Sequence, residues 1–273
     1  MLGRATQDGS VQAAAAEQHV LDQKSIFGLA TVAILAVILC LPFSRTVSWA
    51  DEGVLLHGAE RLLHGDKLYT DFFEFLPPGG FLITAGWFTI FGTSIISARL
   101  LQILTITAIA SLTYLACLRI SKSSFFSSFL AIAWIVMSQG FWTQLNHHWF
   151  TTLFSMLALW TVLNTIDDNR SARGPIIAGL AAGAAGMITP TRGALAVIAS
   201  VMAFIDLQRN LKEAILFLLA VAVVPICLVV YVASEGTLTT SFNDVVLFTL
   251  AHYASIQSVP FASGVLLFAT ALV

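Results

Sequence analysis

Long apolar stretches without charged residues recur along the chain and limit what it can fold into. A helix needs about 20 apolar residues to cross the hydrocarbon core of a bilayer. Hydrophobic residues make up 58% of the 273 residues and charged residues only 10%, more apolar surface than a soluble core of this size can hide. The sequence therefore predicts an all-α polytopic integral membrane protein with about seven or eight transmembrane helices. The runs are residues 26–43, 100–118, 125–137, 149–166, 175–190, 193–205, 214–233 and 261–273.

Basic residues predict the orientation of the chain, because cytoplasmic loops of membrane proteins carry an excess of Lys and Arg. The N-terminal tail, residues 1–25, contains Arg4 and Lys24, and three short loops each contain a basic pair. We therefore expect a cytoplasmic tail (1–25) followed by a transmembrane domain (26–273). The three pairs are Arg119 with Lys122, Arg170 with Arg173, and Arg209 with Lys212.

The apolar stretch 81–91 would disturb this orientation if it crossed the membrane, because all three basic loops would then lie opposite the tail. At about 11 residues it is too short to cross, and the prolines of the preceding Pro77-Pro78-Gly79-Gly80 block continuation of a helix from upstream. We predict a helix at the outer interface. Residues 44 to about 99 then form one long outer loop, which also carries an amphipathic helix at 51–64. The pair 175–190 and 193–205 is consistent with two short spans or a re-entrant hairpin.

Most acidic residues outside the tail and the basic loops lie in this outer loop. Paired carboxylates at a membrane surface could accept a proton from an acceptor group or hold a divalent cation. They could equally be structural, since acidic residues in the first turn of a helix stabilise its dipole. The formal net charge of −2 gives no indication of nucleic-acid binding. The acidic residues are Asp51, Glu52, Glu60, Asp66, Asp71 and Glu74.

The order of motifs in this loop resembles the first-loop block of GT-C glycosyltransferases, with protein O-mannosyltransferases and lipid A aminoarabinose transferases as the nearest relatives. The resemblance covers about residues 25–120. The Gly179-x-x-x-Gly183 stretch, which runs to Pro190-Thr191-Arg192, also resembles a family segment. The matching motifs are Asp51-Glu52-Gly53, Ala59-Glu60-Arg61-Leu62-Leu63-x-Gly65-x-x-Leu68-Tyr69-x-Asp71-Phe72-Phe73-Glu74, Pro77-Pro78-Gly79, Phe91-Gly92 and Ala98-Arg99-Leu100.

The resemblance implies a transferase that moves a sugar from a polyprenyl-phosphate donor to a lipid, glycan or protein acceptor. It places the active loop on the periplasmic face of a bacterial inner membrane. It assigns Asp51 as the catalytic base and Glu74 as its acidic partner, with Glu52 and Asp71 expected to contact substrate. Relatives often carry a Lys just before the prolines, where this chain has Phe75-Leu76. They are also longer, and the chain stops within an apolar run, so we expect an N-terminal fragment.

Polar residues beyond the first loop are weaker candidates. His147 and His148 follow the run 125–137 in a predicted outer loop and could contact the sugar or phosphate, bind metal, or belong to the interfacial polar belt. Adjacent side chains on a helix point about 100° apart, which argues against a joint role. Arg192 could hold the donor phosphate or extend to the interface. A later outer loop contains Glu235, Asp244, His252 and Tyr253, and no spacing distinguishes one of them.

Two other functions remain open at the level of sequence. One is a transporter or flippase of a lipid-linked sugar, and the other is a non-catalytic remnant. Transporters place ionisable groups near the bilayer midplane in broken helices. Here the carboxylates gather in a surface loop and the apolar runs are uncharged, which favours an enzyme. The need for a divalent cation is not determined by the sequence.

Overall fold

The computed structural model describes residues 23–41, 50–139, 144–165, 172–207 and 211–253. Its regular elements are all helical, and no named strand occurs in this part of the chain. The first described helix spans Gln23–Cys40. It is followed by α2 (Ala50–Leu63), α3 (Gly79–Phe91), α4 (Ile95–Ser121), α5 (Ser124–Gln139), α6 (His147–Thr165), α7 (Arg173–Gly186), α8 (Pro190–Met202), η1 (Ala203–Leu207), α9 (Leu211–Ser234), α10 (Leu238–Phe242) and η2 (Asn243–Tyr253). The all-helical prediction is confirmed for these residues.

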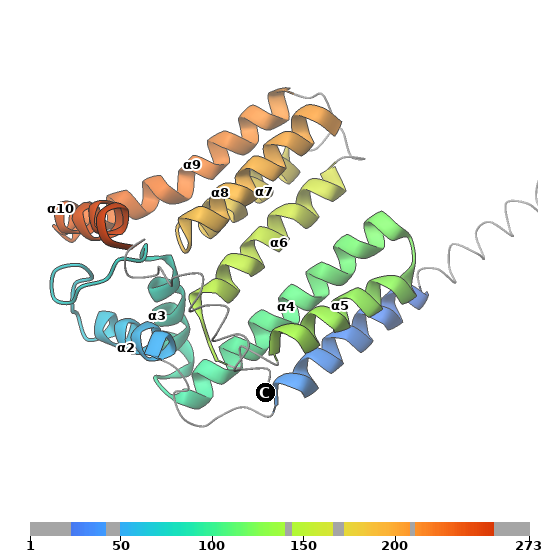
Figure 1. The fold of residues 1–273 in the computed structure, drawn as a ribbon, viewed down its shortest axis with the longest axis horizontal. Helices are drawn as coiled ribbons and strands as arrows, with labels where there is room; N and C mark the ends of the chain where they lie inside the picture. Colours follow the sequence, from blue (N-terminus) through green and yellow to red (C-terminus); the bar gives the residue numbers. More distant parts are fainter. Residues whose placement is uncertain (1–22, 42–49, 140–143, 166–171, 208–210, 254–273) are drawn as a thin grey trace, which may run out of the picture.

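The long helices lie side by side, with α2 and α3 grouped at one end of the bundle (Figure 1). Among the described helices, three are long and apolar enough to cross a membrane: Gln23–Cys40, Ile95–Ser121 and Leu211–Ser234. Shorter apolar helices accompany them, including Pro190–Ile205. The count of seven or eight spans stays a prediction, and the run 261–273 lies outside the described residues.

Both helices of the predicted outer loop form where the sequence predicts them. The first, α2, ends at Leu63, where Gly65 takes a φ of +94° that favours glycine. The second, α3, begins at Gly79 directly after the two prolines and is 13 residues long. The two helices pack closely, because a Cβ added at Gly58 would lie 2.7 Å from the Phe81 ring. Whether α3 stays outside the bilayer remains a prediction.

The helix that follows the predicted outer loop begins before residue 99. Ser94 caps α4, since its side chain accepts a hydrogen bond from Ser97 N, and the helix starts at Ile95. Arg99 consequently lies inside α4, where it is only 1% exposed. The helix begins at its cap, whereas the uncharged apolar run starts only after Arg99. Where the chain enters the membrane stays a prediction.

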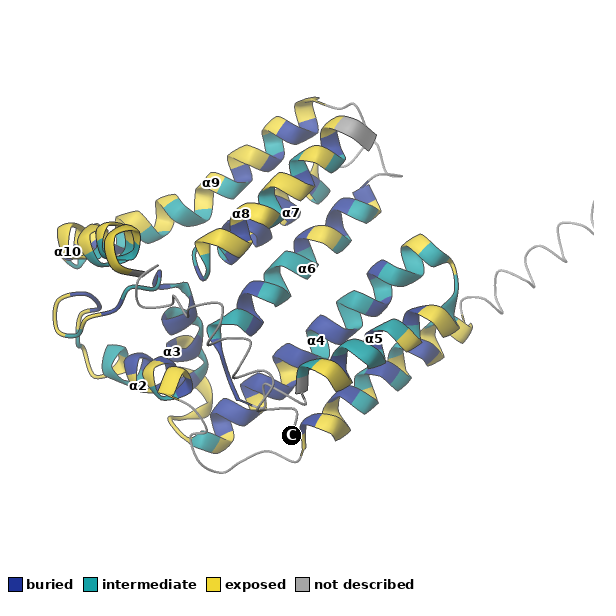
Figure 2. Ribbon diagram, viewed as in Figure 1, coloured by how far each residue is buried: buried dark blue, intermediate teal, exposed yellow. Residues whose placement is uncertain are grey.

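Glycines allow α7 and α9 to approach closely. A Cβ added at Gly179 would lie 2.4 Å from the Phe217 carbonyl oxygen, and one at Gly183 would lie 2.5 Å from that of Val221. Small residues four apart let helix backbones meet in this way. The outward sides of α8, α9 and the first helix carry many exposed positions (Figure 2), large hydrophobic ones among them, such as Ile198, Leu219 and Ile38.

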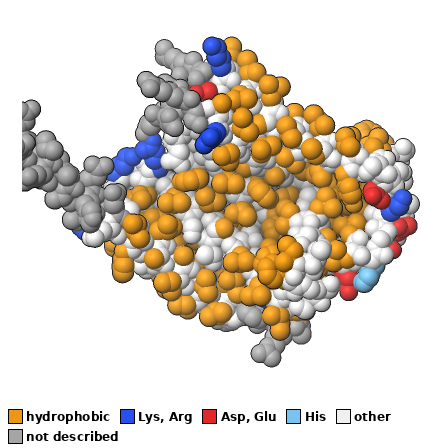
Figure 3. All heavy atoms as spheres, turned by 180° about the vertical axis from the view of Figure 1, so that it is seen from behind, with side chains coloured by type: hydrophobic (Ala, Val, Ile, Leu, Met, Phe, Trp, Pro, Cys, Tyr) orange, Lys and Arg blue, Asp and Glu red, His pale blue; other side chains and the backbone are white. Residues whose placement is uncertain are grey.

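Charge is distributed along the molecule as expected for a chain that crosses a membrane. Figure 3 shows a broad hydrophobic surface with Lys and Arg gathered toward one end and most of the visible acidic side chains toward the other. We call these the basic end and the acidic end. Lys24, Arg119 and Lys122 line one cavity at the basic end. The acidic end contains α2 and α3 and holds the candidate site described next.

Candidate functional site

The first turn of α2 directs its two acidic side chains to different surroundings. Asp51 is exposed and lines a cavity, whereas Glu52 is fully buried. Successive positions on a helix are about 100° apart, which accounts for the divergence. The structure thus separates one carboxylate that a substrate can reach from one that is enclosed by protein.

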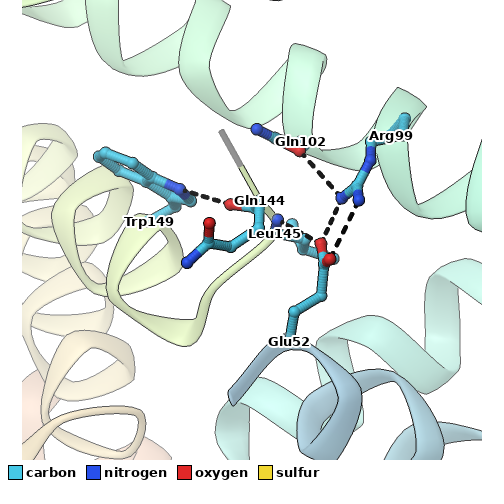
Figure 4. Close-up of polar contacts among 6 residues, drawn as sticks. All are labelled: Glu52, Arg99, Gln102, Gln144, Leu145 and Trp149. Atoms are coloured by element: carbon cyan, nitrogen blue, oxygen red, sulfur yellow. Dashed lines mark hydrogen bonds and ion pairs between the residues drawn. The ribbon is translucent and has the colours of Figure 1, made fainter. Parts of the chain in front are cut away.

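The Glu52 carboxylate joins three parts of the chain (Figure 4). Both of its oxygens contact the Arg99 guanidinium, with Oε2 3.0 Å from Nη2, and Oε1 also accepts the Leu145 N–H at 2.8 Å. Arg99 donates further to Gln102 Oε1 at 3.3 Å. A buried ion pair is tolerated when its remaining hydrogen-bonding capacity is used in this way. Glu52 therefore fixes α2 against α4 and against the segment that leads into α6.

The cavity at the acidic end has a volume of about 500 Å³. It is bounded by the start of α2, the loop before α3, the start of α6 and the residue before α8. The structure therefore brings together four residues chosen from sequence: Asp51, Glu74, His147 and His148. The described residues that line it are Asp51, Val54, Leu55, Phe73, Glu74, Phe75, Leu76, Phe81, His147, His148 and Thr189.

Glu74 is held in place by the backbone that follows it. Its Oε1 accepts the N–H groups of Phe75 at 2.9 Å and Leu76 at 3.1 Å, and the residue is only 4% exposed. Burial raises the pKa of the Glu74 carboxyl, an effect opposed by these two hydrogen bonds and increased by the negative charges of Asp51 and Asp244. Glu74 is thus a carboxyl poised to take up a proton beside an exposed carboxylate.

His147 and His148 begin α6, directly before the apolar run that starts at Trp149. The Asn146 side chain caps this helix by accepting the His148 N–H at 2.9 Å. Both imidazoles line the cavity with ring centroids 4.0 Å apart, although the angle of about 100° between successive helix positions predicted that they would point apart. A joint role of the two side chains in binding stays a prediction. Burial lowers the pKa of His147 to about 3 and that of His148 to about 4, and the positive charge of Arg192 contributes to both shifts.

Besides Glu52, two residues chosen from sequence do not line the cavity. Asp71 is exposed in a turn, where its carboxylate accepts the Lys67 N–H at 2.6 Å and its carbonyl accepts from Arg61. Arg192 is exposed in the first turn of α8 and acts on the histidines through its charge. Contact of either residue with substrate stays a prediction.

Thr189 lines the cavity and Asp244 acts on Glu74 through its charge, and neither was selected from sequence. Thr189 lines the cavity and its hydroxyl accepts a hydrogen bond from Thr151 at 2.9 Å. Asp244 contributes to the raised pKa of Glu74. On the same element, η2, the Phe248 ring packs against Phe73 at 5.0 Å. No local sequence pattern indicates that either residue lies near the cavity, although Thr189 directly precedes the Pro190-Thr191-Arg192 motif.

The cavity wall is apolar directly before the two prolines. Phe75 and Leu76 both line it, and the loop that carries them is fixed to the end of α7 by a hydrogen bond from Gly79 N to the Met187 carbonyl at 3.1 Å. A Cβ at position 79 would lie 2.5 Å from that carbonyl oxygen, so the close approach requires glycine. Among the described residues, no group of three or more His, Cys, Asp or Glu is arranged to hold a metal ion.

A family model for dolichyl-phosphate-mannose-protein mannosyltransferases matches residues 76–232, which is more than half of the chain. The chain belongs to this family. Its members are membrane glycosyltransferases that use polyprenyl-phosphate sugar donors, so the family expected from the loop motifs is confirmed at this level. The match begins inside the cavity wall and includes α3 to most of α9. No curated protein and no solved structure matches the chain.

Proposed function

We propose that this mannosyltransferase-family protein transfers a sugar from a polyprenyl-phosphate donor to an acceptor hydroxyl or amine at its acidic end, with Asp51 as the base. The observation that carries the proposal is the cavity that joins Asp51, Glu74 and both histidines. Asp51 is its exposed carboxylate, while Glu74 is enclosed and Glu52 lies elsewhere in an ion pair. Among these three carboxylates, only Asp51 is both exposed and part of the cavity wall, where an incoming acceptor could reach it.

The reaction is an inverting displacement. The acceptor oxygen or nitrogen forms a bond to the anomeric carbon while the bond from that carbon to the phosphate oxygen breaks. The bonding pair leaves with the polyprenyl phosphate, and the acceptor proton passes to Asp51. Glu74 lines the same cavity, and burial raises the pKa of its carboxyl, which favours its neutral form near the incoming acceptor.

The donor phosphate is proposed to lie toward His147, His148 and Arg192. Phe75 and Leu76 make the opposite part of the wall apolar and unsuited to an anion. Arg192 supplies a permanent positive charge, and a bound phosphate would in turn favour protonation of the adjacent imidazoles. We place this site on the periplasmic face of a bacterial inner membrane, as the basic loops at the opposite end indicate.

Asp51→Asn tests the catalytic assignment. Loss of a general base typically lowers the rate by about 10²–10⁴, so we expect transfer from polyprenyl-phosphate mannose, or from another sugar in a donor panel, to fall by that amount. Glu60→Gln is the matched control, because Glu60 lies on α2 but lines a different depression. Insertion and donor binding should persist in both variants. Near-normal transfer by Asp51→Asn at matched expression would remove the assignment.

A transporter of lipid-linked sugars is the rival function. If the protein were a transporter, neither the parent nor Asp51→Asn would transfer sugar to an acceptor. The substitution would change only the rate at which the donor crosses the membrane of a vesicle. The two functions are distinguished by an assay of the parent in detergent, where no membrane barrier exists. Consumption of the donor with formation of a glycosylated product indicates an enzyme.

A further inference from the structure

A second cavity lies at the basic end, on the far side of the molecule from the candidate site. It has a volume of about 640 Å³ between the starts of the first helix and α5 and the ends of α4 and α6. Lys24, Arg119 and Lys122 line it, and the described lining contains no acidic side chain. These cations come from three different segments: the first helix, the last turn of α4 and the turn that follows it. Nothing in the proposed transfer reaction uses them.

The wall of this cavity is fixed by hydrogen bonds. The Tyr114 hydroxyl donates to the Ser25 carbonyl at 2.8 Å, and the Ser124 hydroxyl donates to the Lys24 carbonyl at 2.9 Å. Gly28 permits the close contact, because a Cβ there would lie 2.5 Å from the Ser124 hydroxyl oxygen. The Lys24 side chain is thereby brought beside the turn that carries Lys122. The start of α5 adds the positive end of a helix dipole to the same region.

An apolar groove continues from this cavity. It has a volume of about 510 Å³ and shares Lys24, Ser124 and Phe125 with the cationic cavity. Phe27, which is 76% exposed, and Thr31 extend the groove along the first helix, while Ser128 extends it along α5. A cationic cavity joined to an exposed apolar groove matches a molecule with an anionic head and a hydrocarbon chain.

We propose that this pair of cavities binds one anionic phospholipid, with the phosphate among Lys24, Arg119 and Lys122 and an acyl chain in the groove between the first helix and α5. The position supports this occupant. The cavity lies at the basic end, and the groove that continues from it follows two apolar helices, which is the level of lipid headgroups in a chain of this orientation. Basic pockets between transmembrane helices on this side are suited to such headgroups. The bound lipid would join the first helix to α4 and α5.

The test is native mass spectrometry of the full chain in detergent, titrated with dioleoyl phosphatidylglycerol, dioleoyl phosphatidylcholine or inorganic phosphate. We expect one phosphatidylglycerol to bind more tightly than phosphatidylcholine. Lys24→Gln with Lys122→Gln should weaken its affinity by about fivefold for each lysine removed. Lys212→Gln is the matched control, because it removes an exposed lysine in the first turn of α9 that does not line the cavity. It should bind phosphatidylglycerol like the parent.

Equal binding of the two lipids, or an unchanged affinity in the double variant, would overturn the proposal. Displacement of phosphatidylglycerol by inorganic phosphate at equal concentration would show that the site takes the free anion, which also overturns a lipid occupant. Ser128→Phe tests the groove. This variant should bind dioleoyl phosphatidylglycerol more weakly than the parent but bind the dihexanoyl form equally well. Unchanged affinity for both lipids would contradict the acyl-chain assignment. These measurements do not depend on transfer activity.

Discussion

At the scale of single residues, neighbouring positions receive opposite roles from their surroundings. Asp51 and Glu52 are consecutive carboxylates, yet one faces a cavity and the other is enclosed with Arg99. Burial similarly distinguishes Glu74, whose pKa is raised, from the exposed Asp71 in the same loop. Chemical identity alone therefore does not select the reactive group, because desolvation and the nearest charge determine its protonation.

Arg192 provides a residue-scale test of phosphate binding. If it holds the donor phosphate, Arg192→Ala should weaken donor binding more than Arg192→Lys, because Lys keeps the charge but loses the bidentate geometry of the guanidinium. Donor affinity can be measured by competition with a labelled polyprenyl phosphate. Parent-like affinity in both variants would show that Arg192 only extends to the interface.

The two histidines should make stability depend on pH. Their pKa values are lowered in the fold, to about 3 for His147 and about 4 for His148, whereas the unfolded imidazoles titrate near 6.5. Below about pH 6.5 the unfolded chain binds more protons, so stability falls as the pH decreases toward these values. We expect His147→Asn to reduce the drop in melting temperature between about pH 7 and about pH 5.

His64→Asn is the control for this measurement, because His64 is exposed just after α2. Glu74 is present in parent and variants alike, so its own opposite pH dependence cancels in the comparison. An identical drop for parent and His147→Asn would contradict the buried, neutral state of this imidazole.

At the scale of elements, the ion pair between Glu52 and Arg99 holds α2 to the helix bundle. It joins α2 to α4 and, through Leu145 N, to the chain before α6. Asp51 and the histidines thus keep their mutual distance because a buried pair next to them fixes both supporting elements. The sequence suggested only that Glu52 would contact substrate. The structure instead predicts a strong effect through positioning.

Glu52→Gln should therefore destabilise the protein by about 3–5 kcal/mol, because it leaves the buried Arg99 guanidinium without its counter-charge. The double variant Glu52→Gln with Arg99→Met removes both charges and should recover part of that loss. Thermal unfolding of the parent, both single variants and the double variant gives the coupling between the two positions. Additive effects would show that the two side chains are not coupled.

At the scale of the whole molecule, the direction of the helices keeps the two kinds of charge apart. The first helix runs from the basic end to the acidic end, and α4 returns. If α3 does not cross the membrane, the loops with the basic pairs lie on the same side of the membrane as Lys24. The hydrogen bonds from Tyr114 and Ser124 to the start of the first helix place the α4–α5 turn at that end.

Single cysteines in a cysteine-free background test this orientation. We expect Lys67→Cys to react with an impermeant maleimide added outside intact cells and Ser123→Cys to react only after permeabilisation. Lys67 lies in the exposed loop after α2, and Ser123 in the turn before α5. Labelling of Ser123→Cys from outside would instead mean that α3 crosses the membrane.

The sequence by itself determined the helical membrane class, the presence of helices α2 and α3, and the family. These follow from features local in the chain: apolar runs, Pro77-Pro78, Gly65 and a block of motifs. Only the tertiary structure decided that His147 and His148 meet Asp51 and Glu74, that Thr189 and Asp244 join them, and that Glu52 pairs with Arg99. Such contacts depend on how helices distant in sequence pack, and on the burial that packing imposes on each charge, which no local pattern contains.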